Sequence, residues 1–474
     1  MKNTNKNIRY ILFAGIAAGM LLVSCRKDTV YTGDVQLQFS DSLITFDTVF
    51  TTIGSVTRIL KVINPHKNTV KTDISLLAGN MSCFSVNVDG EAGTVFKDVE
   101  IRGKDSIFIF IKVNLNQNLQ NMPMVITDTL VFITNGNRQD MELVACGEDA
   151  NFILPNTRIE DNDGDTIHCN IIAKYGETIT WTNNKAYVIY GHVVIDSNAK
   201  WIIDAGTKIY VHKNGGIWIK PSGCIHVNGT KDNPVVFQGD KRSEAYERDF
   251  AQWDGIWISE SEKDMIINHA VIKHAIIGIR AEISKENRGN KLMLTNTEIR
   301  CTEMYGFLGK GYTVEAHNNV FSNSAKSCVA LVQGGTYTFI NNTIYNQYLS
   351  MRTDPAVLLS NMKTNNFQGI FTNNIVYGNL NRELVCSINS NASFMLHVEN
   401  CLIKTEQSVV DKFNTNFNNI LNEDPKLEDV VKYNFSLKSD SPCKGKGKTT
   451  SIPQVQQDIT ETVRNNPPSI GAYE

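Results

Sequence analysis

The sequence predicts an all-β chain in which a β-sandwich is followed by a parallel β-solenoid. Between residues 193 and 237 an apolar-x-apolar unit recurs about every eight residues, and the breaks between units carry turn residues such as Asp, Asn and Gly. Residues 35–146 instead hold about seven longer alternating or β-branched runs, separated by turn signals such as Asn135-Gly136. These two patterns indicate two different β architectures in one chain.

The first 24 residues have the layout of an export signal. Three cations precede an apolar run, 11–23, that is too short to cross a bilayer comfortably. The small residues before Cys25 resemble the bacterial lipobox, which implies cleavage before Cys25 and lipidation of its thiol. We therefore expect an exported lipoprotein of a Gram-negative outer membrane, held by a polar tether over residues 25–33. A plain signal peptide with a chance cysteine is the alternative.

Residues 34–149 are predicted to form the sandwich, because about seven strands in about 115 residues suit two packed sheets. The stretches 50–56, 61–65 and 143–147 resemble immunoglobulin-like domains of the Hydin/ASPM type. The resemblance implies a spacer or an interaction module. No clustering of His, Cys or carboxylate residues in this part of the sequence argues for chemistry.

An acidic stretch, 161–165, lies between the two predicted domains. Its alternating oxygen-bearing side chains around a glycine are compatible with calcium, which prefers oxygen ligands. An EF-hand loop needs a carboxylate at its twelfth position, and Ile172 stands there. We therefore expect a solvated turn, with no resident cofactor and Ca²⁺ as the weaker alternative.

The solenoid is predicted to run from residue 155 to residue 474, ending in a C-terminal cap. Strands this short, joined by turns too tight for a returning strand, must pair with the unit one revolution later. Three units make one revolution, here called a coil, of about 24 residues. After Asp240 the coils lengthen through insertions.

A second repeat keeps the register of the longer coils, because an asparagine recurs once in each. Asparagine tolerates left-handed backbone, and its amide both donates and accepts hydrogen bonds, so stacked copies can form a ladder. The sequence predicts this structural ladder at Asn296, Asn318, Asn341, Asn373 and Asn400.

The repeat resembles a known superfamily. The stretches 205–209, 227–230, 234–237 and 253–256 resemble right-handed parallel β-helix proteins of the pectin-lyase-like superfamily, and the ending 468–474 is similar to their C-terminal coils. The resemblance implies a three-sheet solenoid. It leaves the function open, because the superfamily includes lyases, hydrolases, epimerases and adhesins.

In the polysaccharide-degrading members, the resemblance implies, substrate lies along the sheet that precedes the sheet feeding the Asn turn. Counting strands places the following residues outward on that sheet: Val194, Trp218, Trp257, Gly278, Ala330 and Leu358. None of them is ionisable. Trp218 and Trp257 would be neighbours about 4.8 Å apart, offering flat apolar area to sugar rings. Alternatively, the insertion after Asp240 folds over them and makes a satellite core.

Catalysis would have to come from the loops that flank this sheet. Glycoside hydrolysis needs two carboxylates, and lyase chemistry needs a base and a cation near the sugar's carboxylate. The best supply is the insertion 240–254, so the weak catalytic candidates are Asp240, Asp249, Asp254, Arg280 and Glu282. Mixed charge on a long loop is more typical of a solvated surface.

Other classes of function are disfavoured by composition and spacing. A net charge of −3 gives no basic surface excess for nucleic acid. Of ten cysteines, those beyond Cys25 are odd in number and form no CxxC pair, so we expect no metal site and no disulfide framework. We therefore expect a lipoprotein that binds an extended polysaccharide or cell-surface glycan. A polysaccharide lyase or glycoside hydrolase, and a structural or adhesive protein, are the alternatives.

Overall fold

The computed structural model describes residues 33, 35–50, 57–113, 124–148, 150–160, 166–241, 247–283, 291–347, 352–362, 365–406, 408–409 and 418–474. The chain divides into two compact units, and the boundary between them in the sequence lies between Asp149 and Ala150. The export signal, Cys25 and the acidic stretch 161–165 lie outside the described residues. Among the helices that were described, none has the length and apolar character needed to cross a membrane.

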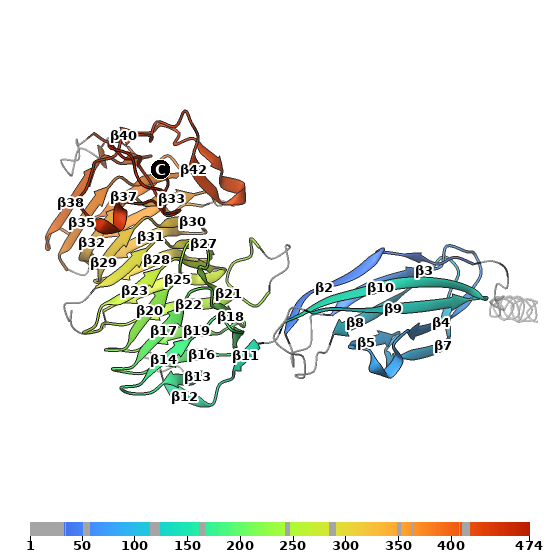
Figure 1. Ribbon diagram of the computed structural model, residues 1–474. Coiled ribbons are helices and arrows are strands. Elements are labelled where there is room, and N and C mark those ends of the chain that lie inside the picture. The colour runs from blue at the N-terminus through green and yellow to red at the C-terminus, as the bar shows by residue number, and fades with distance from the viewer. Residues whose placement is uncertain are drawn as a thin grey trace, which may run out of the picture. The chain divides into compact units, whose positions relative to one another are not determined.

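The described residues of the N-terminal unit form two five-stranded sheets. Figure 1 shows the arrangement of their strands. The first sheet contains, in spatial order, β1 (Gln38–Phe39), β3 (Arg58–Ile63), β8 (Ser106–Val113), β5 (Phe84–Val88) and β6 (Glu91–Gly93). The second contains β2 (Leu43–Phe50), β10 (Asn137–Glu148), β9 (Met124–Thr134), β4 (Val70–Leu76) and β7 (Val95–Ile101), and η1 (Gly79–Met81) follows β4. Alternate residues of both sheets, such as Leu60 and Phe132, share one buried core, so the sheets pack face to face as a sandwich.

The second unit is a parallel β-helix of three sheets, as predicted. Sheet I has ten strands: β12 (Thr157–Glu160), β13 (Thr166–Ala173), β16 (His192–Ile195), β19 (Gly216–Ile219), β22 (Trp253–Ile258), β25 (Ala275–Glu282), β28 (Tyr305–Lys310), β31 (Ser327–Val332), β34 (Val357–Ser360) and β37 (Leu384–Ser387). Sheet II follows it along the chain: β14 (Thr178–Trp181), β17 (Lys200–Asp204), β20 (Cys224–Asn228), β23 (Met265–Asn268), β26 (Leu292–Thr295), β29 (Thr313–His317), β32 (Gly335–Ile340), β35 (Phe367–Thr372) and β38 (Phe394–Glu399).

Sheet III closes each coil: β11 (Ala150–Ile153), β15 (Ala186–Ile189), β18 (Lys208–Val211), β21 (Val235–Gly239), β24 (Ala270–Lys273), β27 (Glu298–Thr302), β30 (Val320–Ser324), β33 (Thr343–Asn346), β36 (Ile375–Gly378), β39 (Leu402–Ile403) and β40 (Ile420–Leu421). Figure 1 shows the coils stacked along one axis. Inward residues of the three sheets, such as Ile203, Ile219 and Phe237, form one continuous core. Each large side chain buried there contributes about 1.5–3 kcal/mol.

The turn between sheets II and III carries the predicted asparagines. Their φ angles are all left-handed: 50° at Asn296, 55° at Asn318, 56° at Asn341, 57° at Asn373 and 48° at Asn400. Their amides stack in part, since Asn318 Nδ2 donates to Asn296 Oδ1 at 3.2 Å and Asn373 Nδ2 donates to Asn341 Oδ1 at 3.3 Å.

A second asparagine ladder lies one residue further along, on the buried side of the same turn. Asn319 Nδ2 donates to Asn342 Oδ1, and Asn342 Nδ2 donates to Asn374 Oδ1, both at 2.9 Å. All three side chains are fully buried. This inner ladder was not predicted, although the doublets Asn318-Asn319, Asn341-Asn342 and Asn373-Asn374 are visible in the sequence.

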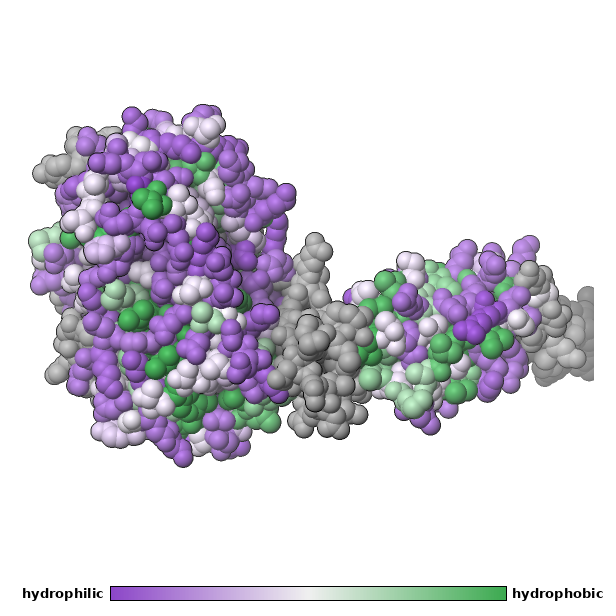
Figure 2. All heavy atoms as spheres, in the orientation of Figure 1, coloured by the Kyte–Doolittle hydropathy of each residue, from purple (hydrophilic) through white to green (hydrophobic). Residues whose placement is uncertain are grey.

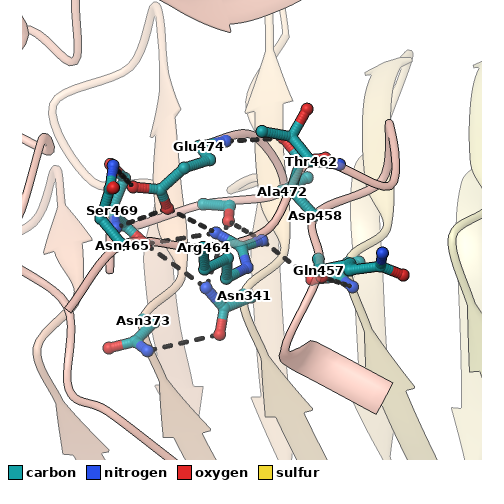
Figure 3. Close-up of polar contacts among 12 residues, drawn as sticks. Asn341, Asn373, Gln457, Asp458, Thr462, Arg464, Asn465, Ser469, Ala472 and Glu474 are labelled. Atoms are coloured by element: carbon teal, nitrogen blue, oxygen red, sulfur yellow. Dashed lines mark hydrogen bonds and ion pairs between the residues drawn. The ribbon is translucent and has the colours of Figure 1, made fainter. Parts of the chain in front are cut away.

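The C-terminal segment folds back over the outer face of sheet III. It contains the hairpin of β41 (Leu427–Asp429) and β42 (Asn434–Leu437) and two short helices, η3 (Val430–Lys432) and η4 (Pro453–Val455). Arg464 donates to Asn318 Oδ1 at 2.9 Å and to the carbonyl of Gly471 at 3.0 Å, and Asn341 Nδ2 lies 3.4 Å from the same carbonyl (Figure 3). The outer amides of the ladder therefore bind the returning chain.

Candidate functional site

One outward file of residues on sheet I forms the floor of the candidate site. Strand pairing aligns the following residues along it: Ile171, Val194, Trp218, Trp257, Arg280, Leu308, Ala330, Leu358 and Val385. The prediction that Trp218 and Trp257 lie in this file is confirmed. The prediction that Gly278 lies next to Trp257 is wrong. The strand count also omitted β28, which contributes Leu308. The expectation of a file without ionisable residues is therefore also wrong, because Arg280 belongs to it.

A β-bulge causes this shift of register. Gly255 pairs with Ile277, but the next residue, Ile256, pairs with Ile279, so β25 holds one extra residue at this point. Gly255 has a φ of 112°, and a Cβ atom on it would lie 1.6 Å from the Ile277 carbonyl oxygen. The bulge therefore requires glycine, and it moves Arg280 into the position next to Trp257.

Trp218, Trp257 and Arg280 form a continuous stack along the file. The two indole rings are 4.9 Å apart between centroids and inclined by 9°, and the Arg280 guanidinium lies 4.6 Å from the Trp257 centroid. Because each indole face covers the next, the rings present edges to the surface. The expectation that both tryptophans offer flat faces to sugar rings is therefore wrong.

Trp218 is the more enclosed of the pair. Its side chain forms a buried cluster with Cys169 and Val194, against which Ile159, Ile167 and Ile171 pack, and Trp218 is 7% exposed. Its Nε1 donates to Ser259 Oγ at 3.2 Å. Residues of β12 and β13 cover Trp218. The alternative stated from the sequence, that the insertion after Asp240 would cover it, is therefore wrong. Trp257 is half-buried and remains available at the surface.

A hollow of about 280 Å³ opens beside this stack. Three polar groups enter it, His192, Asp254 and Arg280, against a largely apolar wall. Its other lining residues are Ile167, Gly216, Ile217, Trp218, Gly255, Ile256, Trp257, Ile276 and Ile277. An apolar wall with a few directed polar groups is typical of a small-molecule or saccharide subsite.

His192 and Asp254 meet across an intervening strand. His192 Nε2 lies 2.9 Å from Asp254 Oδ2, although the two residues belong to coils on either side of Gly216. A Cβ atom at Gly216 would lie 3.0 Å from the imidazole and 3.2 Å from Asp254 Cβ. The missing side chain at Gly216 therefore lets the pair form. Sequence reasoning missed His192, because the partner is far along the chain and no spacing motif joins them.

Arg280 is held by Glu282 as well as by Trp257. Its Nε donates to Glu282 Oε2 at 2.5 Å, and Lys310 Nζ lies 3.3 Å from Glu282 Oε1. Glu282 thus lies between two cations and beside the hollow, not in it. The Arg280 side chain is 34% exposed, so part of the guanidinium is free to meet a ligand.

The other acidic candidates lie outside the described lining of the hollow. Asp240 Oδ2 is 2.6 Å from His212 Nδ1, and the His212 ring stacks on Tyr190 at 4.5 Å. Burial, followed by the charge of Asp240, raises the pKa of Tyr190 to about 12. Asp249 is half-buried and contributes nothing to the lining.

The insertion also contains Glu247, which forms ion pairs with cations of sheet III. Its carboxylate accepts two hydrogen bonds from Lys273 Nζ, at 2.8 and 2.9 Å, and lies 3.3 Å from Arg300. Burial alone would raise the pKa of Glu247, but the hydrogen bond and charges of these cations lower it. Within the described ranges, no group of three or more His, Cys, Asp or Glu side chains is arranged to hold a metal ion.

Residues 173–285 match the pectate-lyase-like beta helix domain family. This stretch holds the described lining of the hollow apart from Ile167. No curated protein matches the chain.

Among solved structures, the chain is similar to the Escherichia coli chaperone DraB (11% identity, TM-score 0.18, covering 25% of this chain and 57% of that one). It is also similar to a family 123 glycoside hydrolase from Clostridium perfringens (6%, 0.18, 25% and 30%) and to the Pseudomonas fluorescens DNA glycosylase AlkC (10%, 0.15, 24% and 31%). The chain thus spans less than two thirds of each of these proteins.

Proposed function

We propose that this chain is an exported lipoprotein whose β-helix binds an extended polysaccharide along sheet I. The observation that supports this most is the hollow beside Trp257, where an indole edge, a partly exposed guanidinium and the His192–Asp254 pair converge. Sugars combine apolar C–H surface with many hydroxyl groups, which such a mixed lining satisfies. The match to a pectate-lyase-like domain fits a role connected with polysaccharide.

Arg280 gives the hollow a cation that could pair with the carboxylate of an acidic sugar. The planar Arg280 guanidinium is fixed on one face by Trp257, so little rotamer freedom is lost when it pairs with a carboxylate. Beyond Arg280 the file continues with Leu308 and Ala330, which are only 6% and 0% exposed, so contact with a long chain would centre on the hollow beside Trp257.

Affinity electrophoresis tests this proposal. Gels containing acidic or neutral polysaccharides should retard the wild-type protein, and Trp257→Ala should lose most of that retardation. Met395→Ala is the matched control, since Met395 is 56% exposed but lies in β38 on sheet II. Equal retardation of all three proteins would place the binding surface elsewhere. A lack of retardation in every gel would favour the structural or adhesive alternative.

A polysaccharide lyase is the second candidate, and the His192–Asp254 pair favours it. An imidazole held by a carboxylate is a suitable general base, and Arg280 could neutralise a substrate carboxylate. Hydrolysis by paired carboxylates is less well supported, because Asp254 is the one carboxylate in the described lining. A lyase forms unsaturated sugars with ultraviolet absorbance, which His192→Gln should abolish while Met395→Ala does not.

The membrane anchor and the immunoglobulin-like spacer belong to the same proposal. Lipidation at Cys25 would hold the sandwich next to the bilayer and display the β-helix beyond it. Metabolic labelling with a fatty acid should mark the wild-type chain but not Cys25→Ser. Labelling of both would remove Cys25 as the site of attachment.

A further inference from the structure

The N-terminal sandwich exposes apolar side chains on one face of its first sheet. Ile59 on β3 is 53% exposed, and Phe108 and Phe110 on β8 are 49% and 40% exposed. Strand pairing places Ile59 directly opposite Phe110, so these side chains adjoin on the outer face. We call the outer face of the first sheet that carries Ile59, Phe108 and Phe110 the Phe108 face. Figure 2 shows that hydrophobic residues also occur on the surface of this unit that faces the viewer.

Cations accompany these apolar groups. Lys61 pairs with Phe108 across the strands, and its Nζ lies 5.9 Å from the centre of the Phe108 ring. Lys112 lies two residues beyond Phe110 on the same side of β8 and is exposed. On the next strand, β5, Ser85 and Asn87 face the same way, so the outward positions of these three strands contain no carboxylate beside the two lysines.

We propose that the Phe108 face docks on the surface of an anionic phospholipid bilayer. Aromatic and aliphatic side chains partition into the boundary between head groups and acyl chains, while lysine side chains reach anionic head groups. The inference rests on the proposed anchor at Cys25. Roughly ten residues separate Cys25 from Val35, and at about 3.5 Å per residue the sandwich would stay within about 35 Å of the bilayer.

Because the tether keeps the sandwich close to the bilayer, a small apolar and basic surface is sufficient for docking. A patch of three apolar side chains and two lysines would bind a membrane only weakly from free solution. Once the chain is anchored, docking becomes an intramolecular step with a high effective concentration of lipid. Docking by the Phe108 face would also fix which side of the sandwich faces away from the bilayer.

The test uses the full lipidated chain in vesicles of about two parts phosphatidylcholine to one part phosphatidylglycerol, some with brominated acyl chains. Phe108→Trp places a fluorophore on the face. Ile133→Trp is the matched control, because Ile133 on β9 of the second sheet is 45% exposed. The native tryptophans all lie beyond residue 150, so the parent chain supplies the background.

Docking predicts that brominated lipid quenches the emission added by Phe108→Trp at least about twofold more than that added by Ile133→Trp, since docked side chains lie within about 10 Å of the acyl boundary. Adding Lys61→Glu and Lys112→Glu to Phe108→Trp should remove the difference. Equal quenching in both variants, while the protein still floats with the vesicles, would overturn docking and leave the anchor intact. A chain that does not float with the vesicles would overturn the anchor and docking together.

Discussion

Gly216 lies between His192 and Asp254, and its missing side chain lets these two residues meet. Gly216→Ala should displace the imidazole from the carboxylate, because the new methyl would lie 3.0 Å from the His192 ring. We expect a loss of about 1–3 kcal/mol in unfolding free energy, as for other overpacked sites, and a clear loss of polysaccharide affinity. Binding as tight as that of the wild type, measured by titration calorimetry, would exclude the His192–Asp254 pair from the site.

We expect His274 to make the stability of the β-helix sensitive to acid. It is 2% exposed, and burial lowers its pKa to about 4, with the hydrogen bond to the Glu247 carbonyl opposing the shift. As the pH falls below about 6.5, the unfolded chain binds a proton at this histidine before the folded chain does. The unfolding free energy should therefore decrease by up to about 3 kcal/mol between pH 6.5 and pH 4.

Urea unfolding of wild type and His274→Gln at several pH values measures this effect. The variant should lose part of the acid dependence, whereas the two proteins should keep parallel pH dependence between about pH 7.5 and pH 9. A variant that retains the full acid dependence would assign the effect to other groups. Two of these are His269 and His317, because burial also lowers their pKa values.

At the scale of elements, the inner asparagine ladder fixes the turn between sheets II and III. Asn342 Oδ1 accepts from the backbone nitrogen and the amide of Asn319, and its Nδ2 donates to the carbonyl of Ala316, all at 2.9 Å. Asn342→Ala should cost at least about 3 kcal/mol, because several buried polar groups would lose partners. Asn400→Ala, at the exposed end of the outer ladder, should cost about 1 kcal/mol in the same chemical denaturation experiment. Equal costs would contradict this account of the ladders.

A buried ion pair joins Glu383, the residue before β37, to Arg352 in the loop before β34. Arg352 Nη1 donates to Glu383 Oε2 at 2.9 Å, Arg352 Nη2 donates to Oε1 at 2.5 Å, and neither side chain is exposed. Glu383→Gln would leave the guanidinium uncompensated, so we expect a loss of about 3–5 kcal/mol. Glu406→Gln is the control, because its pair with Arg382 is 3.6 Å long and exposed, and its loss should cost no more than about 1 kcal/mol. Thermal unfolding of both variants distinguishes the two cases.

The strand count shows how far sequence reasoning reaches at this scale. Period-two alternation and turn residues placed Trp218 beside Trp257, because both lie in short, regular strands. The same count failed at Arg280, since a bulge inserts one residue without changing the apolar pattern. Gly255 is the sequence feature that corresponds to the bulge, because its positive φ requires glycine. The sequence alone does not show this role, because it depends on contact with the Ile277 carbonyl of the neighbouring strand.

At the scale of the whole molecule, the repeat period was sufficient to predict the β-helix. Every coil must bury the same face against its neighbours, so the pattern recurs locally and is visible without contacts. The site was less predictable, because His192, Gly216 and Asp254 come together only when coils stack. The cover over Trp218 was likewise hidden, since β12 pairs antiparallel to β13 and departs from the repeat.

The most direct test of the proposed binding surface is a double-mutant cycle on Trp257 and Arg280. The wild type, Trp257→Ala, Arg280→Gln and the double variant would be titrated calorimetrically with the acidic polysaccharide that retards the protein most. Because Trp257 fixes the Arg280 guanidinium at 4.6 Å, we predict that both single changes weaken binding and that they are coupled by about 1 kcal/mol. Unchanged affinity in both single variants would contradict the proposal that this file of sheet I binds polysaccharide.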